Sequence, residues 1–354
     1  MDLKARFSTK LDKLLFTEIR KGTKIGEYIL EDDIYMPLKS ENLVGKVKEG
    51  NTFNEIPISL FVEGMFFVLG VDDEFKYKLE YMEILKSIDM SRNFIKSKIA
   101  ELVKNEGYED AFIYLKGLSK IEETKDVYEK LLYVLDILRN EDKVFEAEEL
   151  KIIKRAKSFE KFATPHLYEA IILRDQGDFL KALSLVNEYE LNGGKVENDI
   201  AELKQNLISI NQYDKGKELV IEEPETALKV LIPLLPVLGD NAEIYYYVAI
   251  AYRNLGNHEK AIYYLNEASA IDNSILEVLN EYGINYASLR DFESALNYFE
   301  KAFSENKSIE LCTNIIMCYL HLNDLKGAEE YIAEAEKINP NDEVLMDIKK
   351  IMIK

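Results

Sequence analysis

Tryptophan is absent from this chain of 354 residues, and cysteine, histidine and proline are rare, with two, three and seven copies. Cys312 and Cys318 lie six residues apart in one predicted helix, where their side chains point to different faces and cannot bridge each other. We interpret both as buried small apolar residues. No segment approaches the run of about 18 apolar residues that a membrane-spanning helix requires. The N-terminus lacks the apolar core of a secretory signal, so we expect a cytoplasmic protein.

The chain also lacks a recognisable arrangement for catalysis or metal binding. His166, His258 and His321 lie far apart, and none has a cysteine or histidine at the spacing of metal ligands. The segment KGTKIG at residues 21–26 has neither the glycine spacing nor the Lys-Ser/Thr pair of a phosphate-binding loop. We therefore expect no catalytic residue, no metal, no cofactor and no enzymatic activity. An enzyme built on residues 1–90 would rest on no motif.

Positive charge is scarce as well, because 45 Lys and Arg residues are outnumbered by 65 Asp and Glu residues, for a net charge of −20. Such a chain repels phosphate backbones, so we expect no binding to nucleic acid. Residues 1–24 are the exception, with seven basic and three acidic residues. The low proline and glycine content favours helices, and a hydrophobic fraction of 47% is typical of a folded globular protein.

A helical pattern begins at residue 242 with the sequence AEIYYYVAIAYRN. With Ala242 as position 1, positions 4, 7, 8 and 11 are apolar and fall on one side of a helix. Gly256 ends this helix, because glycine tolerates positive φ. A second helix follows, and its apolar face is spaced by four and three residues: Ala261, Leu265 and Ala268.

The same pattern recurs after 34 residues and again after 33. The first-helix positions are filled by Leu279, Tyr282, Gly283 and Tyr286, and then by Cys312, Ile315, Ile316 and Tyr319. Position 20, in the second helix, is alanine each time: Ala261, Ala295 and Ala328. A residue this small lets two antiparallel helices approach closely. An ordinary amphipathic bundle, the alternative, would not keep a fixed period.

This pattern resembles the tetratricopeptide repeat, a helix-turn-helix unit with the motif W-x2-L-G-x2-Y, then A-x3-F, then P. Tyr282-Gly283 with Tyr286 matches the L-G-x2-Y segment, with tyrosine in place of leucine, and Ala295 with Phe299 matches A-x3-F. Pro340 fills the proline position once, and the tryptophan position holds Tyr245, Leu279 and Cys312. The resemblance implies a mainly all-α fold, an α-solenoid of such repeats wound into a right-handed superhelix with a concave groove.

We divide the chain into four segments on this basis. Residues 163–341 contain repeats, which are clearest at 242–341, and residues 57–162 contain diverged helical repeats. Residues 342–354 have one apolar and one polar face, as a capping helix of a solenoid needs. Residues 1–56 combine an amphipathic helix with an irregular or β-like segment.

The predicted amphipathic helix covers residues 3–20 and has a basic face. It could lie on a membrane surface or dock on an acidic partner, but we favour a third interpretation, packing onto the acidic body of its own chain. Beyond it, residues 28–30, 34–36 and 43–48 could form a small hairpin. Residues 58–69 are expected to begin the helical part, with a buried strand as the alternative.

In the repeat family, positions 2, 5, 9, 12 and 13 of each first helix line the concave face. By this resemblance the binding face comprises Glu243, Tyr246, Ile250, Arg253, Asn254, Glu277, Asn280, Ile284, Glu310, Thr313 and Met317. The glutamates at position 2 have apolar neighbours, which favours a ligand with basic and hydrophobic side chains. The alternative is that these glutamates are simply solvated.

Two hypotheses for the function follow. The first is a non-enzymatic scaffold or adaptor that binds a peptide or protein segment in the concave groove. The alternative is a peptide-gated bacterial regulatory protein with residues 1–56 as its output module. The sequence identifies neither the partner nor the oligomeric state.

Overall fold

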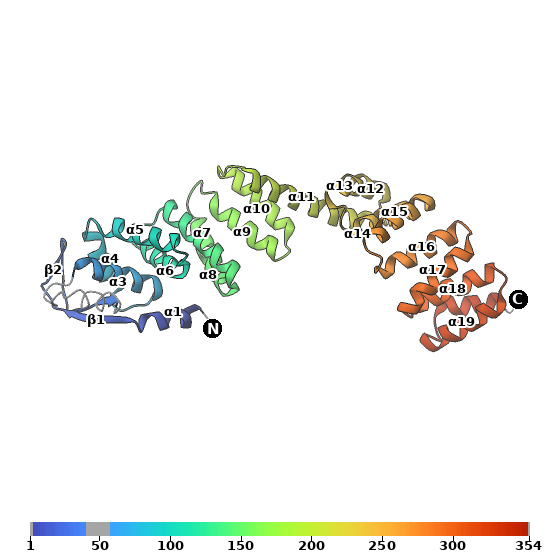
Figure 1. Cartoon of the computed structure of the whole chain (residues 1–354), viewed down its shortest axis with the longest axis horizontal. Coiled ribbons are helices and arrows are strands. Elements are labelled where there is room, and N and C mark those ends of the chain that lie inside the picture. The colour runs from blue at the N-terminus through green and yellow to red at the C-terminus, as the bar shows by residue number, and fades with distance from the viewer. Residues whose placement is uncertain (1–2, 40–56, 353–354) are drawn as a thin grey trace. The chain divides into compact units, whose positions relative to one another are not determined.

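The computed structural model describes residues 3–39 and 57–352, which fall into two compact units, Met1–Ala201 and Glu202–Lys354 (Figure 1). The expected fold class is confirmed, because most of the described residues form helices that follow one another as antiparallel hairpins. Strands in this part of the chain lie near the N-terminus. The segment boundaries at residues 56/57 and 162/163 remain predictions.

The helices of the first unit pack mainly against their neighbours in sequence. They are α1 (Leu3–Leu11), α3 (Ile58–Val71), α4 (Lys78–Ser87), α5 (Ser91–Lys104), α6 (Tyr108–Ser119), α7 (Lys125–Glu141), the 3-10 turn η1 (Lys143–Phe145), α8 (Glu146–Ala156), α9 (Thr164–Asp175) and α10 (Phe179–Leu191). Helix α11 (Asn198–Leu219) begins in the first unit and continues into the second.

The second unit continues the series of hairpins. Its further elements are α12 (Pro224–Leu231), η2 (Ile232–Leu234), α13 (Leu235–Leu238), α14 (Ala242–Asn254), α15 (His258–Ile271), α16 (Leu276–Ser288), α17 (Phe292–Glu305), α18 (Ile309–His321), α19 (Leu325–Ile338) and α20 (Glu343–Met352). Among the helices in the described part of the chain, none combines the length and the apolar character needed to cross a bilayer.

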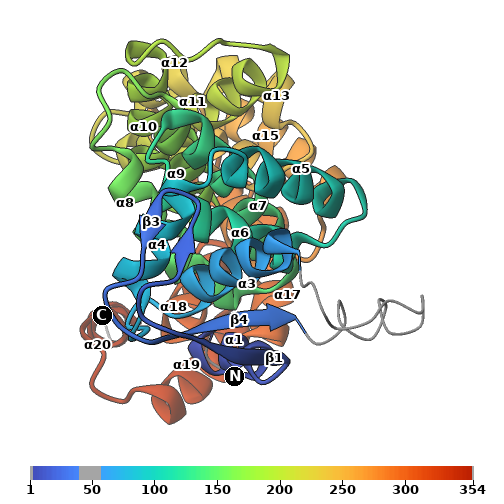
Figure 2. The same ribbon diagram turned by 90° about the vertical axis from the view of Figure 1, so that its left-hand side faces the viewer.

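The predicted helix over residues 3–20 is wrong in its second half. Helix α1 ends at Leu11, and the following residues form strand β1 (Leu14–Ile19), which pairs in antiparallel register with β4 (Ile34–Lys39). The β-branched and aromatic side chains of β1 suit a strand, and its pairing with β4 overrides the helical spacing of its leucines. Figure 2 shows β1 alongside β4, with α3 next to β4.

The predicted hairpin differs from the observed one. Strand β2 (Lys24–Ile25) pairs with β3 (Tyr28–Ile29), whereas residues 34–36 belong to β4 and pair with β1. The expected strand over residues 43–48 lies outside the described residues.

Helix α1 packs onto its own chain, as we favoured. Phe7 is buried, and the basic face forms ion pairs with acidic residues of the same unit. Lys10 Nζ lies 2.9 Å from Glu109 Oε2 and 2.6 Å from Asp110 Oδ1. Arg6 pairs with Glu109 and, at 2.9 Å, with Asp142. The basic N-terminal segment therefore compensates part of the acidic charge of the helices.

Residues 58–69 are helical, within α3, and the strand alternative is wrong. Helix α3 is buried along most of its length and packs against α6 through glycines on both helices. A Cβ atom at Gly117 would collide with the carbonyl of Phe66, and one at Gly70 would collide with the carbonyl of Ile113. Because these glycines have no side chain, the backbones of α3 and α6 pack in direct contact. This close packing buries the almost wholly apolar helix α3.

Five hairpins share one turn geometry. In each, the residue at the end of the first helix has positive φ, and the next residue donates its N–H to the carbonyl five positions earlier, as in a Schellman motif. The residues with positive φ are Glu106, Gly177, Gly256, Arg290 and Asn323. In four of the hairpins the following Asp or Asn caps the second helix with its side chain: Asp178, Asn257, Asp291 and Asp324. This turn occurs in both units, so the repeated hairpin extends beyond residues 242–341.

The helices of the second unit pack as the repeat pattern predicts. Ala261, Ala295 and Ala328 are fully buried in helices that pack against the first helix of their own hairpin. The prolines at 233 and 236 divide the segment after α12 into a 3-10 turn and a short helix, because proline lacks the N–H that a continuous helix needs. Helix α20 buries Leu345 and Ile348 and leaves Val344 and Ile351 exposed, and its role as a cap stays a prediction.

Candidate functional site

Two adjoining pockets in the second unit contain six of the predicted binding residues. The acidic pocket has a volume of about 220 Å³ and lies between the beginnings of α16 and α18 and the end of α17. Its lining comprises Tyr246, Leu276, Glu277, Asn280, Ala302, Asn306, Ser308, Glu310 and Leu311. The structure thus brings together predicted residues from three successive repeats.

The polar groups of the acidic pocket are poorly satisfied within the chain. The Asn280 Oδ1 atom is buried and has no hydrogen-bond partner in the described residues. Glu277 and Glu310 are exposed, and no salt bridge of either occurs in the same part of the chain. Burial raises the pKa of Tyr246 to about 12, with a further contribution from Glu281, so this hydroxyl stays protonated at neutral pH. The pocket therefore offers acceptor oxygens and negative charge to a ligand.

The second pocket, the apolar pocket, lies at the opposite ends of the same helices. It has a volume of about 440 Å³ and is lined by Ile284, Ala287, Ser288, Arg290, Phe292, Phe299, Asn314, Met317, Cys318 and His321. The His321 and Phe292 rings stack with centroids 4.2 Å apart and an interplanar angle of 4°. Burial raises the pKa of Cys318 to about 11, so this cysteine is a neutral thiol and part of the apolar wall.

The two pockets follow each other along α16. Glu277 and Asn280 line the first, and Ile284 and Ala287 line the second, in each case seven residues later. Seven residues of a helix span about 10 Å. An extended ligand that lies along α16 therefore meets negative charge first and an apolar surface about 10 Å further on.

The remaining predicted residues are engaged within the unit. Ile250 and Thr313 are buried, and the Thr313 hydroxyl donates to the Glu310 carbonyl at 2.9 Å. Asn254 donates to the Val220 carbonyl at 2.8 Å, and Glu243 accepts a hydrogen bond from the Tyr213 hydroxyl at 2.9 Å. The contacts of Asn254 and Glu243 join α14 to the preceding segment, whereas the Thr313 contact lies within α18.

Arg253 is held by a glutamate that the sequence pattern does not single out. Its Nε lies 3.0 Å from Oε2 of Glu281, which is buried. Burial raises the pKa of Glu281, and the positive charge of Arg253 acts in the opposite direction. The guanidinium therefore stabilises the charged form of this buried carboxylate. Glu281 occupies position 6 of its repeat, where the other repeats have Tyr247 and Asn314. Position 6 lies outside the apolar stripe of the first helix, so the repeat pattern does not mark Glu281 as buried.

Other lining residues were missed because they come from the second helix or from the loops. Phe292, Asn306 and Ser308 lie at the ends of α17 or just beyond it. The repeat pattern assigns only first-helix positions to the groove. In the described residues, His, Cys, Asp and Glu side chains form no group of three that could hold a metal ion.

Two family models, both described as tetratricopeptide repeat, match residues 242–274 and 286–346. Among solved structures the chain is similar to MamA (20% identity, covering 49% of this chain and 90% of that chain, TM-score 0.37). It is also similar to TTC0263, a thermophilic TPR protein in Thermus thermophilus (18% identity, covering 54% of this chain and 100% of that chain, TM-score 0.33). A third similar structure is YrrB, a TPR protein with an unusual peptide-binding site (18% identity, covering 56% of this chain and 96% of that chain, TM-score 0.35). Similarity at this level carries no information on function. A comparison with curated proteins finds no significant match.

Proposed function

Because residues 242–274 and 286–346 match its models, the chain belongs to the tetratricopeptide repeat family, and we propose that it is a non-enzymatic scaffold that binds a peptide or protein segment. The proposed site is the pair of pockets along α16. The observation that carries the proposal is the buried Asn280 Oδ1, which has no partner in the described residues and lies in a pocket with two exposed glutamates. A buried acceptor without a donor is costly, and a peptide N–H would satisfy it.

The charge of the acidic pocket selects the ligand. Glu277 and Glu310 favour a lysine or arginine side chain and disfavour an acidic one. The apolar pocket, lined by Ile284, Met317 and two phenylalanine rings, accepts a hydrophobic side chain. The preferred partner therefore carries both kinds of residue, and nucleic acid is disfavoured by the same negative charge.

The separation of the pockets sets the spacing of the motif. A peptide in the extended polyproline II conformation rises about 3.1 Å per residue with about three residues per turn, so side chains three residues apart lie on the same face, about 9 Å from each other. This distance matches the separation of about 10 Å between the pockets. We expect a basic residue and a large apolar residue separated by two others.

The proposal is tested with fluorescein-labelled peptides and the full chain, with fluorescence polarisation as the measurement. The peptides place one arginine and one leucine at separations from one to six residues in an otherwise Gly/Ser sequence. Saturable binding should be strongest at a separation of three and should weaken at least tenfold in the double variant Glu277→Lys, Asn280→Ala.

The matched control is the double variant Glu293→Lys, Asn297→Ala. Both residues are exposed on α17 and line neither pocket. The control should bind as the wild type does. Absence of saturable binding at every separation, or equal loss in both double variants, would overturn the proposal.

The peptide-gated regulator has less support. Its output module would need the N-terminal segment to act independently, yet Phe7, Leu14, Ile34 and Met36 share one apolar core with α3 and the helices that follow. We place the scaffold in the cytoplasm, since both cysteines are free thiols buried in the second unit.

A further inference from the structure

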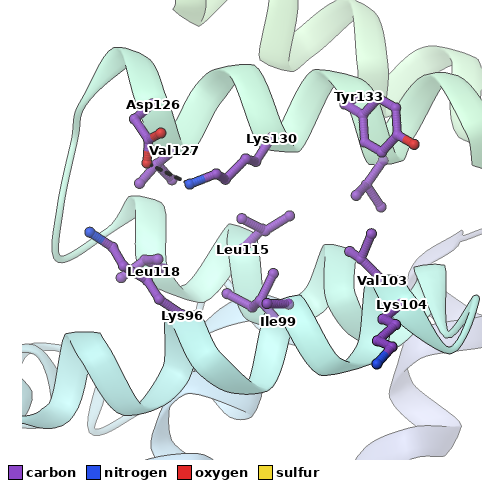
Figure 3. Close-up of a pocket in the computed structure, with 12 residues that line it drawn as sticks. Lys96, Ile99, Val103, Lys104, Leu115, Leu118, Asp126, Val127, Lys130 and Tyr133 are labelled. Carbon is purple, nitrogen blue, oxygen red and sulfur yellow. Dashed lines mark hydrogen bonds and ion pairs between the residues drawn. The ribbon is translucent and has the colours of Figure 1, made fainter.

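Another cavity lies in the first unit, between α5 and α7 (Figure 3). Both helices pack against α6, which forms the floor of a cleft of about 410 Å³. Its deep lining is aliphatic: Ile99 from α5, Leu115 and Leu118 from α6, and Val127 and Val134 from α7 are all buried. Figure 3 shows Val103 and Leu115 directed into the space between the two outer helices. A volume of this size suits a small-molecule ligand.

The rim of the cleft carries one lysine whose charge is not balanced by a salt bridge in the described residues. Lys96, Lys104 and Lys130 line it together with one acid, Asp126, whereas the chain has a net charge of −20. Lys96 Nζ lies 2.7 Å from Glu122, and Lys130 Nζ lies 2.8 Å from Asp126. Lys104 is exposed and forms no salt bridge within residues 3–39 and 57–352. It lies at the same end of the cleft as Tyr133.

We propose that this cleft binds a single-chain aliphatic carboxylate, with the alkyl chain on Ile99, Val103, Leu115 and Val134 and the carboxylate at Lys104. The flexible stem of the lysine lets its ammonium reach over the mouth. From Lys96 to Lys104 the helix advances about 12 Å, which suits a chain of about ten carbons.

The lining favours an alkyl chain over a peptide. The walls are helices, so their backbone N–H and C=O groups are bonded within each helix and offer nothing to an extended main chain. The polar side chains of the cleft lie at its rim, its floor consists of leucines of α6, and valines line the walls. A peptide backbone in such a cleft would lose hydrogen bonds to water without replacement, whereas an alkyl chain loses none.

The test is isothermal titration calorimetry of the full chain with straight-chain carboxylates of six to twelve carbons, each below its micelle concentration. Affinity should rise about fourfold per methylene until the cleft is filled, at about ten carbons. Decyltrimethylammonium, which has the opposite charge, should bind at least fivefold more weakly than decanoate. Equal binding of the cation, or no saturable heat with decanoate, would overturn the proposal.

Two variants locate the binding site. Ala100→Phe places a ring in the mouth of the cleft from an exposed position and should weaken decanoate binding at least tenfold, whereas Ala333→Phe, at an exposed position of α19, should not. Lys104→Gln should weaken binding about threefold to fivefold, and Lys98→Gln, on the same helix outside the cleft, should have no effect. Unchanged binding in Ala100→Phe, or saturable binding of an acidic amphipathic peptide without binding of decanoate, would show that the assignment is wrong.

Discussion

The Arg139 Nε atom lies 2.9 Å from Oε2 of Glu149, and both side chains are completely buried. The same guanidinium binds Asp136 at 2.5 Å and Asp175 at 2.9 Å. Because Arg139 belongs to α7, Glu149 to α8 and Asp175 to α9, one cation connects three successive helices of the first unit. Asp175 also pairs with Arg174 at 2.7 Å, whereas Asp136 and Glu149 have Arg139 as their cation in the described residues. The cluster is therefore sensitive both to loss of Arg139 and to pH.

Substitution of Arg139 by methionine should lower the unfolding free energy of the first unit by about 3–5 kcal/mol, since it leaves buried carboxylates without their partner. Arg155→Met is the control, because Arg155 pairs with Glu123 where both side chains are about half exposed. Its loss should cost less than about 1 kcal/mol. Urea denaturation followed by circular dichroism measures both values, and similar effects of the two substitutions would contradict the assignment.

The stability of the cluster should depend on pH through Glu149. Burial raises the pKa of this carboxyl to about 7 from its ordinary value of 4.5, with Arg139 acting in the opposite direction. The folded state therefore holds the proton more tightly than the unfolded state, and this contribution is complete below pH 4.5 and is lost as pH rises through 7. Relative to Glu149→Gln, the wild type should lose about 2 kcal/mol of unfolding free energy between pH 5 and pH 8.

The pH prediction is checked by urea denaturation of both proteins at the two pH values. Glu259→Gln, an exposed substitution on α15, controls for the removal of a carboxylate alone and should differ from the wild type equally at pH 5 and pH 8. A pH-independent difference between the wild type and Glu149→Gln would show that the carboxyl is charged throughout this range.

The shared hairpin turn predicts a stabilising substitution. Arg290 has φ of 65°, a conformation that costs a residue with a Cβ about 1 kcal/mol or more relative to glycine. Arg290→Gly should therefore raise the unfolding free energy of the second unit by about 0.5–1 kcal/mol. Asn297→Gly, at an exposed helical position of α17, should lower it by a similar amount, because glycine weakens helix interiors. A decrease in both variants, measured by thermal denaturation, would contradict the turn geometry.

Much of the fold was predictable because helical hairpins depend on local patterns. The apolar spacing, the alanine at position 20 and the turn residues all lie within one repeat, so residues 242–341 contain the information for their own helices. Strand β1 was not predictable in this way. Its partner β4 begins 15 residues after β1 ends, and the leucines of β1 fit a helical stripe equally well until that pairing is known.

The candidate site was predictable only in outline. Of the predicted positions, Tyr246, Glu277, Asn280 and Glu310 line one pocket, and Ile284 and Met317 line the other, while their role in binding stays a prediction. Ile250 and Thr313 occupy equivalent positions of their repeats but line neither pocket, because both side chains are buried against neighbouring residues. Helical periodicity gives the direction of a side chain, whereas its exposure depends on what the adjacent hairpin places beside it.

The recurring left-handed turn also affects how this chain can change in length. Gly256, Arg290 and Asn323 hold equivalent places, 34 and then 33 residues apart, and each precedes an Asn or Asp cap. Each pair of helices between two of these residues is therefore preceded and followed by a turn of the same geometry. Duplication or excision of a whole pair would rejoin two ends that already fit each other, whereas a cut within a pair would leave ends with no common connector. We therefore expect this chain to gain or lose length by whole pairs of helices.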